Sequence, residues 1–205
     1  WLAAVHGDEE GCRSLAAEAR PVVAGRHTGG TALVDWGLGL LDLAGGRFDA
    51  ALDRFESIRG AVGRDVPIRA GADLVEAAVR AGRPDRAAGA AGELERWAAH
   101  VATPAAQALA LRCRALLLPP DGDDDAGDLL AEAAARAPSP YDRARTQLLW
   151  GEWLRRRRRR TEAGTRLQAA TEGFEKLGAE RWAQRARTEL AALGQRPVAR
   201  PHDAD

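Results

Sequence analysis

The chain has 205 residues, of which 45% are hydrophobic and 29% charged, and its 30 basic and 30 acidic side chains leave no net charge. This length suits one ordinary domain or one elongated repeat array, and the charge balance gives no global electrostatic reason to bind nucleic acid or an anionic membrane. Nothing resembles a signal peptide, and no apolar run approaches the roughly 20 residues that a membrane span needs. We therefore expect a cytoplasmic protein. Few β-branched residues and abundant Ala, Leu, Arg and Glu predict an all-α fold.

Helical periodicity and turn signals divide the chain into helices. Residues 8 to about 24 are expected to form the second helix of a truncated first hairpin, and Pro21 should kink or shorten this helix. Proline and hydroxyl residues predict two further starts, at Pro104 and after Ser139. A last helix, 180–193, is expected to cover the exposed end of the array, since terminal repeats need a cap. Between the first and last helices, four hairpins are predicted over residues 32–58, 68–99, 105–136 and 141–178.

The hairpins share a register of small residues. Ala51, Ala87, Ala126 and Ala163 follow a turn at spacings of 36, 39 and 37 residues, and two of them have a glycine twelve positions earlier, at 39 and 151. Such a pattern is typical of tetratricopeptide hairpins, whose standard period is about 34 residues. We therefore predict degenerate, tetratricopeptide-like hairpins stacked in a right-handed superhelix over residues 1–193. Residues 194–205 are polar and contain proline, as a linker does.

Several sequence motifs that could indicate binding or catalysis also have a purely structural explanation. The run Arg155–Arg160 could contact phosphates, but it lies between two predicted helices, so we favour a solvated turn. The acidic stretch 121–132 resembles a calcium loop, although Ala126 stands where the sharp-turn glycine is needed. Cys12 and Cys113, each in an Ala/Leu-rich segment, are expected to be reduced packing residues. The four histidines are far apart with no ligand spacing, and no motif supports catalysis, so neither a metal site nor an enzyme is predicted.

The remaining candidate is a binding surface. In tetratricopeptide geometry the first helices of the hairpins line a concave groove, which would suit a partner segment or a small effector. The alternative is that the repeats coil tightly and bury these side chains against one another. The groove residues predicted by this register are Leu33, Trp36, Leu40, Arg69, Glu76, Leu111, Arg145 and Glu152.

The segment Arg143–Gly194 is similar to the end of the helical-repeat region in large ATP-binding LuxR-family transcriptional regulators, which are common in actinobacteria. The likeness is carried by the arginine-rich turn after Gly-Glu-Trp-Leu and by the step Phe-Glu-x-Leu-Gly-Ala. The resemblance implies an NTPase domain before this array and a helix-turn-helix domain after it, so the chain would be part of a longer protein. ATP and DNA would bind to those domains, and no ligand residue is carried over to this chain.

By this resemblance, the array would act as a sensor or protein-interaction module that responds to an effector or partner. Two alternatives remain open. The array could be a passive scaffold that links the NTPase and DNA-binding domains, or a generic peptide-binding adaptor. Neither requires a cofactor in this chain.

Overall fold

The computed structural model describes residues 1–23, 28–59, 65–119 and 125–194. Within these ranges all regular structure is helical, with eleven α-helices, one 3-10 helix and no strand, so the predicted all-α class is confirmed. In chain order the elements are α1 (Leu2–His6), α2 (Glu9–Val23), α3 (Thr28–Ala44), α4 (Phe48–Ile58), α5 (Asp65–Arg80), η1 (Pro84–Ala87), α6 (Ala88–Val101), α7 (Pro104–Leu117), α8 (Asp125–Arg136), α9 (Pro140–Arg156), α10 (Arg160–Lys176) and α11 (Glu180–Ala191).

Helices α7 and α9 begin where the sequence predicts, at a proline that follows a hydroxyl side chain. The Thr103 hydroxyl accepts a hydrogen bond from the backbone N–H of Ala106 at 3.3 Å. The Ser139 hydroxyl likewise accepts one from the backbone N–H of Asp142 at 3.3 Å. Each cap satisfies one of the N–H groups that a helix start leaves without an intrahelical partner.

Other boundaries differ from the predicted ones. Helix α3 begins at Thr28 rather than at residue 32, and α5 begins at Asp65 rather than at residue 68. Pro21 lies in the last turn of α2, which ends at Val23. The helices extend past the local sequence signals because most helical stability comes from tertiary packing of a helix face, which outweighs the propensity of single residues.

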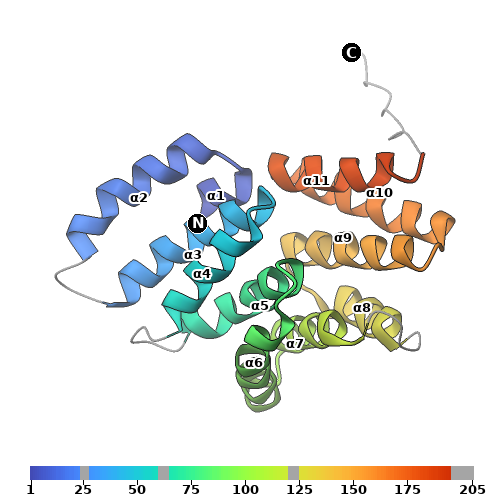
Figure 1. The fold of residues 1–205 in the computed structure, drawn as a ribbon, viewed down its shortest axis with the longest axis horizontal. Helices are drawn as coiled ribbons and strands as arrows, with labels where there is room; N and C mark the ends of the chain where they lie inside the picture. The colour runs from blue at the N-terminus through green and yellow to red at the C-terminus, as the bar shows by residue number, and fades with distance from the viewer. Residues whose placement is uncertain (24–27, 60–64, 120–124, 195–205) are drawn as a thin grey trace.

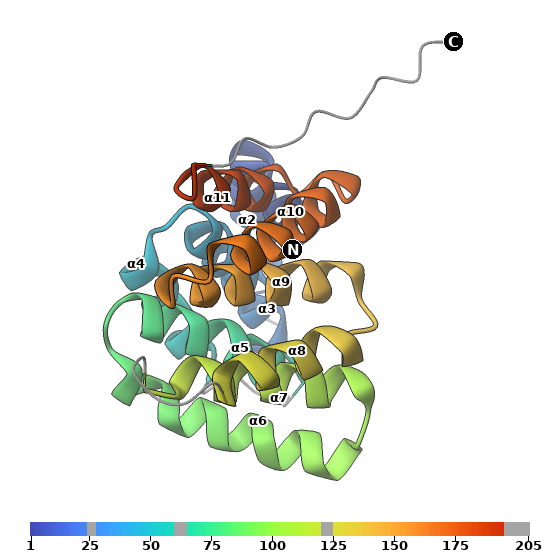
Figure 2. The same cartoon turned by 90° about the vertical axis from the view of Figure 1, so that its right-hand side faces the viewer.

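Consecutive helices pack as antiparallel hairpins, in the pairs α3/α4, α5/α6, α7/α8 and α9/α10 (Figures 1 and 2). The four alanines of the predicted register are all buried, with at most 4% of their surface exposed. A Cβ atom added to Gly39 would lie 2.4 Å from the Phe55 ring, and one added to Gly151 would lie 2.5 Å from Leu167 Cγ. In both hairpins the two helices therefore approach each other as closely as the small-residue pattern predicts.

The two ends of the helical array meet. Helix α11 packs on α10 and also contacts α1 and α3, so the first and last helices lie side by side (Figure 1). Arg181 donates a hydrogen bond from Nε to the Gly7 carbonyl at 3.1 Å and pairs with the Glu9 carboxylate. Trp182, the next residue of α11, is fully buried. The hairpins thus follow one another around an arc whose ends are joined.

One large apolar cluster extends through the hairpins, and the rings of Tyr141, Phe174 and Trp182 lie in it within 6.3 Å of one another. Cys12 and Cys113 are buried free thiols, as predicted. Among the helices described here, none combines the length and the apolar character needed to cross a bilayer.

The close approach at Gly151 predicts a measurable cost for one added methyl group. Gly151→Ala should lower the free energy of unfolding by about 1–2 kcal/mol, because α10 must shift to accommodate the new Cβ, and this outweighs the gain in helix propensity. The matched control is Gly92→Ala in α6, where the added Cβ would meet only the flexible Arg96 side chain at 3.4 Å. Urea denaturation should show the control to be neutral or stabilised; equal effects at the two sites would contradict the packing argument.

Candidate ligand-binding site

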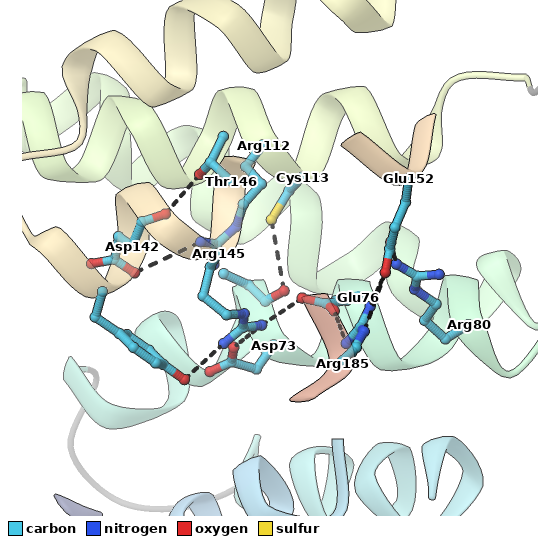
Figure 3. Close-up of polar contacts among 12 residues, drawn as sticks. Asp73, Glu76, Arg80, Arg112, Cys113, Asp142, Arg145, Thr146, Glu152 and Arg185 are labelled. Carbon is cyan, nitrogen blue, oxygen red and sulfur yellow. Dashed lines mark hydrogen bonds and ion pairs between the residues drawn. The ribbon is translucent and has the colours of Figure 1, made fainter. Parts of the chain in front are cut away.

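Six charged side chains, four of them buried and two partly buried, form a cluster that we call the central ion network, to which α5, α9 and α11 contribute (Figure 3). Arg145 donates from Nη2 to Asp73 Oδ1 at 3.0 Å and to Glu76 Oε2 at 2.5 Å. Arg185 donates from Nη1 to Glu76 Oε1 and from Nη2 to Glu152 Oε1, both at 3.0 Å. The network consists of Asp73, Glu76 and Arg80 from α5, Arg145 and Glu152 from α9, and Arg185 from α11.

The network balances three carboxylates with three guanidinium groups in the interior of the protein. Burial alone would oppose the ionisation of Glu76, but Arg145, Arg185 and Arg80 hold the pKa of this carboxyl well below its ordinary value. Burial likewise opposes the charge on Arg145, whereas the nearby Glu76 carboxylate helps to raise the pKa of Arg145 well above its usual range. Both side chains therefore stay charged at neutral pH, and each requires the other.

Asp73 connects the network to a neighbouring pocket. Its Oδ1 atom accepts from Arg145, and its Oδ2 atom accepts a hydrogen bond from Trp36 Nε1 at 2.8 Å. Burial raises the pKa of Asp73, and the nearby Arg145 guanidinium only partly offsets this effect. A change in the position of the Trp36 ring would thus act directly on a carboxylate that belongs to the network.

The pocket, which we call the aromatic pocket, has a volume of about 560 Å³. This lies within the range of roughly 300–1,000 Å³ that is usual for small-molecule sites. Its walls come from α3, α5, α6, α7 and α9, together with Trp1 and the turn before α9. The residues that line it are Trp1, Trp36, Leu40, Arg69, Asp73, Trp97, Val101, Thr103, Ala105, Ala106, Leu109, Arg112, Pro138, Ser139, Tyr141, Asp142 and Arg145.

Neither the phenol nor the thiol near this pocket is prepared for chemistry at neutral pH. Burial raises the pKa of Tyr141 to about 12 and that of Cys113 to about 12. The Cys113 thiol lies 3.9 Å from the Ala72 carbonyl oxygen, to which it donates weakly. A buried thiol that stays protonated is a poor nucleophile, so the arrangement is suited to binding.

The eight groove residues predicted from the sequence lie in four different settings. Trp36, Leu40, Arg69 and Arg145 line the aromatic pocket, and Glu76 and Glu152 lie in the central ion network together with Arg145. Leu111 instead lines a separate depression of about 500 Å³ next to α6 and α8, and Leu33 is exposed on α3, outside both hollows. Glu76, Arg145 and Glu152 are buried against one another, which corresponds to the alternative considered for the groove, whereas Arg69 is exposed.

Sequence reasoning missed other residues of the site. Asp73 lies one helical turn before Glu76 and on the same face of α5. Two acidic residues on one face of an Ala-rich helix were the sequence signal that could have identified Asp73 as part of the site. Trp97, Arg112 and Tyr141 carry no such signal, because their meeting in one pocket depends on how α6, α7 and α9 pack.

The arginine run lies at the turn between α9 and α10, as predicted. Its side chains are largely engaged within the protein. Arg155 pairs with Glu189 at 2.7 Å, Arg159 pairs with Glu162 at 2.7 Å, and Arg160 donates to the Leu193 carbonyl at 2.5 Å. These contacts join the turn to the end of α11 and favour the structural explanation over phosphate binding.

Residues 121–124 of the acidic stretch considered for calcium lie outside the described residues. Within the described part, Asp125 begins α8 and Glu132 pairs with Arg136 at 2.6 Å. The described ranges hold no group of three or more His, Cys, Asp or Glu side chains arranged to bind a metal ion.

No family model matches the chain, and comparison with curated proteins and with solved structures gives no match either. The aromatic pocket, the central ion network and the sequence resemblance therefore remain as the basis for a functional proposal.

The pairing in the network predicts a large effect of removing one cation. Arg145→Met should lower the free energy of unfolding by about 3–5 kcal/mol, because it leaves buried carboxylates without their main partner. The control is Arg136→Gln, which removes a half-exposed pair with Glu132 and should cost about 0.5 kcal/mol or less. Chemical denaturation of both variants measures the difference; similar small losses would contradict the role given to Arg145.

The depressed pKa of Glu76 predicts a pH dependence. Its ionised form stabilises the fold above the ordinary pKa of 4.5, and this contribution is lost as the pH falls toward the lower value of the folded state. The stability difference between the native chain and Glu76→Gln should thus be largest near pH 7 and should shrink below about pH 4.5.

Urea denaturation at a series of pH values measures this difference directly, and the comparison with the variant is needed because the raised pKa of Asp73 acts in the opposite direction. Glu162→Gln is the control: the pKa of Glu162 is also lowered, by its hydrogen bond from Arg159, but the group is exposed and its effect should be small. A difference for Glu76→Gln that does not change with pH would contradict the assignment.

Proposed function

We propose that this chain is a sensor module that binds a small effector in the aromatic pocket. The observation that carries the proposal is the pocket itself, a hollow of about 560 Å³ with three indole rings and a phenol ring in its walls. Its polar and charged groups lie on different helices and converge on one hollow, as in sites that fix the orientation of a ligand. No catalytic role is proposed, since the groups in the pocket favour binding.

The route from pocket to fold begins at Trp36. A ligand that contacts this ring acts on Asp73, which shares Arg145 with Glu76, and Glu76 in turn binds Arg185 of α11. An effector that prefers one arrangement of these helices would shift the array toward it, by no more than its difference in affinity between the two states. The proposal includes a right-handed, tetratricopeptide-like superhelix, for which the buried alanine register and the close approaches at Gly39 and Gly151 are the support.

The sequence resemblance supplies the proposed context. The array would be the cytoplasmic sensor or interaction region of a large ATP-binding LuxR-family transcriptional regulator, with an NTPase domain before it and a helix-turn-helix domain after it. The partners of the array would be these two domains and an effector. Coding sequence that places a P-loop upstream of residue 1 and a helix-turn-helix downstream of residue 205 would support this context, and its absence on both sides would remove it.

The rival function is a passive scaffold between two such domains. Two observations favour it. The central ion network fills the middle of the array with paired charges. In addition, Arg181 of α11 contacts Gly7 and Glu9 and so joins the last helix to the first part of the array. A scaffold needs this rigidity and no ligand. The two functions differ in one measurable property, which is saturable binding of a small molecule.

A thermal-shift screen of metabolites, followed by tryptophan fluorescence, tests the sensor function. An effector should raise the melting temperature, and the shift should grow with the logarithm of its free concentration once this exceeds the dissociation constant. Val101→Trp, at a half-exposed position in the pocket wall, should weaken that binding about tenfold or more without destabilising the fold. Leu33→Ala, exposed and outside the pocket, is the control and should leave binding unchanged. No stabilisation by any metabolite would favour the scaffold.

A further inference from the structure

We propose that the ligand of the aromatic pocket is a small amphipathic carboxylate, whose carboxylate group pairs with Arg112 and whose apolar body lies against Trp36 and Trp97. This inference rests on the proposed function and adds to it the chemical class of the effector.

Arg112 is a buried cation with unused hydrogen-bond donors. It extends from α7 into the wall of the pocket, and only 2% of its surface is exposed. Its nearest described carboxylate oxygen, Asp142 Oδ1, lies 3.7 Å from Nη1, beyond hydrogen-bonding distance, and its Nε atom has no partner among the described residues (Figure 3). A buried guanidinium normally has its donors satisfied, because leaving them unpaired is costly. An acceptor that enters the pocket would remove this cost.

Arg145, in the wall of the same pocket, is much better paired than Arg112: its Nε atom also has no partner among the described residues, but both of its Nη atoms donate hydrogen bonds. It is equally buried, and it donates to the Tyr141 hydroxyl at 3.2 Å as well as to Asp73 and Glu76. The Asp73 carboxylate is itself occupied on both oxygens, by Arg145 and by Trp36. Of the two guanidinium groups that line the pocket from buried positions, Arg112 is therefore the one available to a ligand.

The net charge of the pocket wall indicates whether the ligand should carry one negative charge or two. Three arginines face two aspartates there, so the lining carries one excess positive charge. A monoanion neutralises this excess, whereas a phosphate dianion would bring a second negative charge close to Asp73 and Asp142. A planar carboxylate also matches the planar donor pattern of a guanidinium. These two conditions together favour a carboxylate.

The rest of the pocket indicates an apolar body. Trp36, Trp97, Leu40, Val101 and Leu109 supply aromatic and aliphatic walls, and the volume of about 560 Å³ is much larger than a carboxylate group needs. A ring or a short hydrocarbon chain attached to the carboxylate would fill this space and displace water from apolar surface.

Isothermal titration calorimetry with two matched probes tests the inference. 1-Naphthylacetate and 1-naphthylacetamide have nearly the same shape and differ in charge. On the native chain the acid should bind about ten- to a hundredfold more tightly than the amide, the effect expected for hydrogen bonds to a charged group. Naphthyl phosphate, the third probe, should bind more weakly than the acid.

Two variants identify the responsible cation. Arg112→Met should abolish the preference for the acid and keep the binding of the amide, and its melting temperature should be unchanged or higher, because it removes a poorly paired buried charge. The control, Arg114→Met, changes an exposed arginine of the same helix that lines the other depression, and it should leave the preference unchanged.

Each remaining outcome has one meaning. Equal binding of the acid and the amide to the native chain would overturn the carboxylate and leave the pocket function in place. Tighter binding of naphthyl phosphate would overturn the choice of anion. Acid preference that survives in Arg112→Met, or a strong loss of stability in that variant, would overturn the role of Arg112. Absence of saturable binding by all three probes would overturn both the inference and the pocket function that it builds on.

Discussion

The fold depends on the double ion pair of Arg145 with Asp73 and Glu76. This guanidinium lies at the meeting point of α5, α9 and α11, with its Cζ atom 4.1 Å from the centre of the Trp182 ring. A buried cation is tolerated only when its charge and its donors are matched, and here carboxylates and aromatic faces provide the match. The arrangement fixes the relative positions of three helices more specifically than apolar contact would, because displacement of any one of them leaves a buried charge without its partner.

Small residues make this centre possible. Gly39 and Gly151 let the two helices of their hairpins approach until Phe55 and Leu167 touch the backbone at these glycines. The two helices of each hairpin therefore lie close together. Long charged side chains then extend from α5 and α9 into the interior, where they meet others from α11. The aromatic pocket lies beside this charged centre and shares Asp73 and Arg145 with it, so α5 and α9 contribute to both the pocket and the network.

The helices and their hairpin register could be predicted from the sequence because their signals are local. The caps at Thr103 and Ser139 and the glycine that precedes Ala163 by twelve positions act within a helix or between two neighbours. The site could be predicted only in part. Trp36 and Arg69 line the aromatic pocket, but Leu111 lines another hollow, because α7 contributes Leu109 and Arg112 to the aromatic pocket instead.

Ion pairs between residues that are far apart in the sequence could not be predicted, for a related reason. Arg145 and Asp73 are 72 residues apart, and Arg185 and Glu76 are 109 apart. With thirty cations and thirty anions available, only the packing of the helices decides which of them become partners. Glu76, Arg145 and Glu152 are among the predicted groove residues, and their burial against one another is visible only in three dimensions.

The contact of α11 with α1 and α3 changes how the array should respond to stress. In an open repeat array each unit touches only its neighbours, so terminal units can fray and the total stability approximates a sum of local terms. Here the Arg181 side chain spans 172 residues of sequence to reach Glu9, which turns a linear chain of units into a loop. Loosening of either end breaks contacts with the other, so opening at one end should be felt at both, and the array is expected to unfold more cooperatively than an open one.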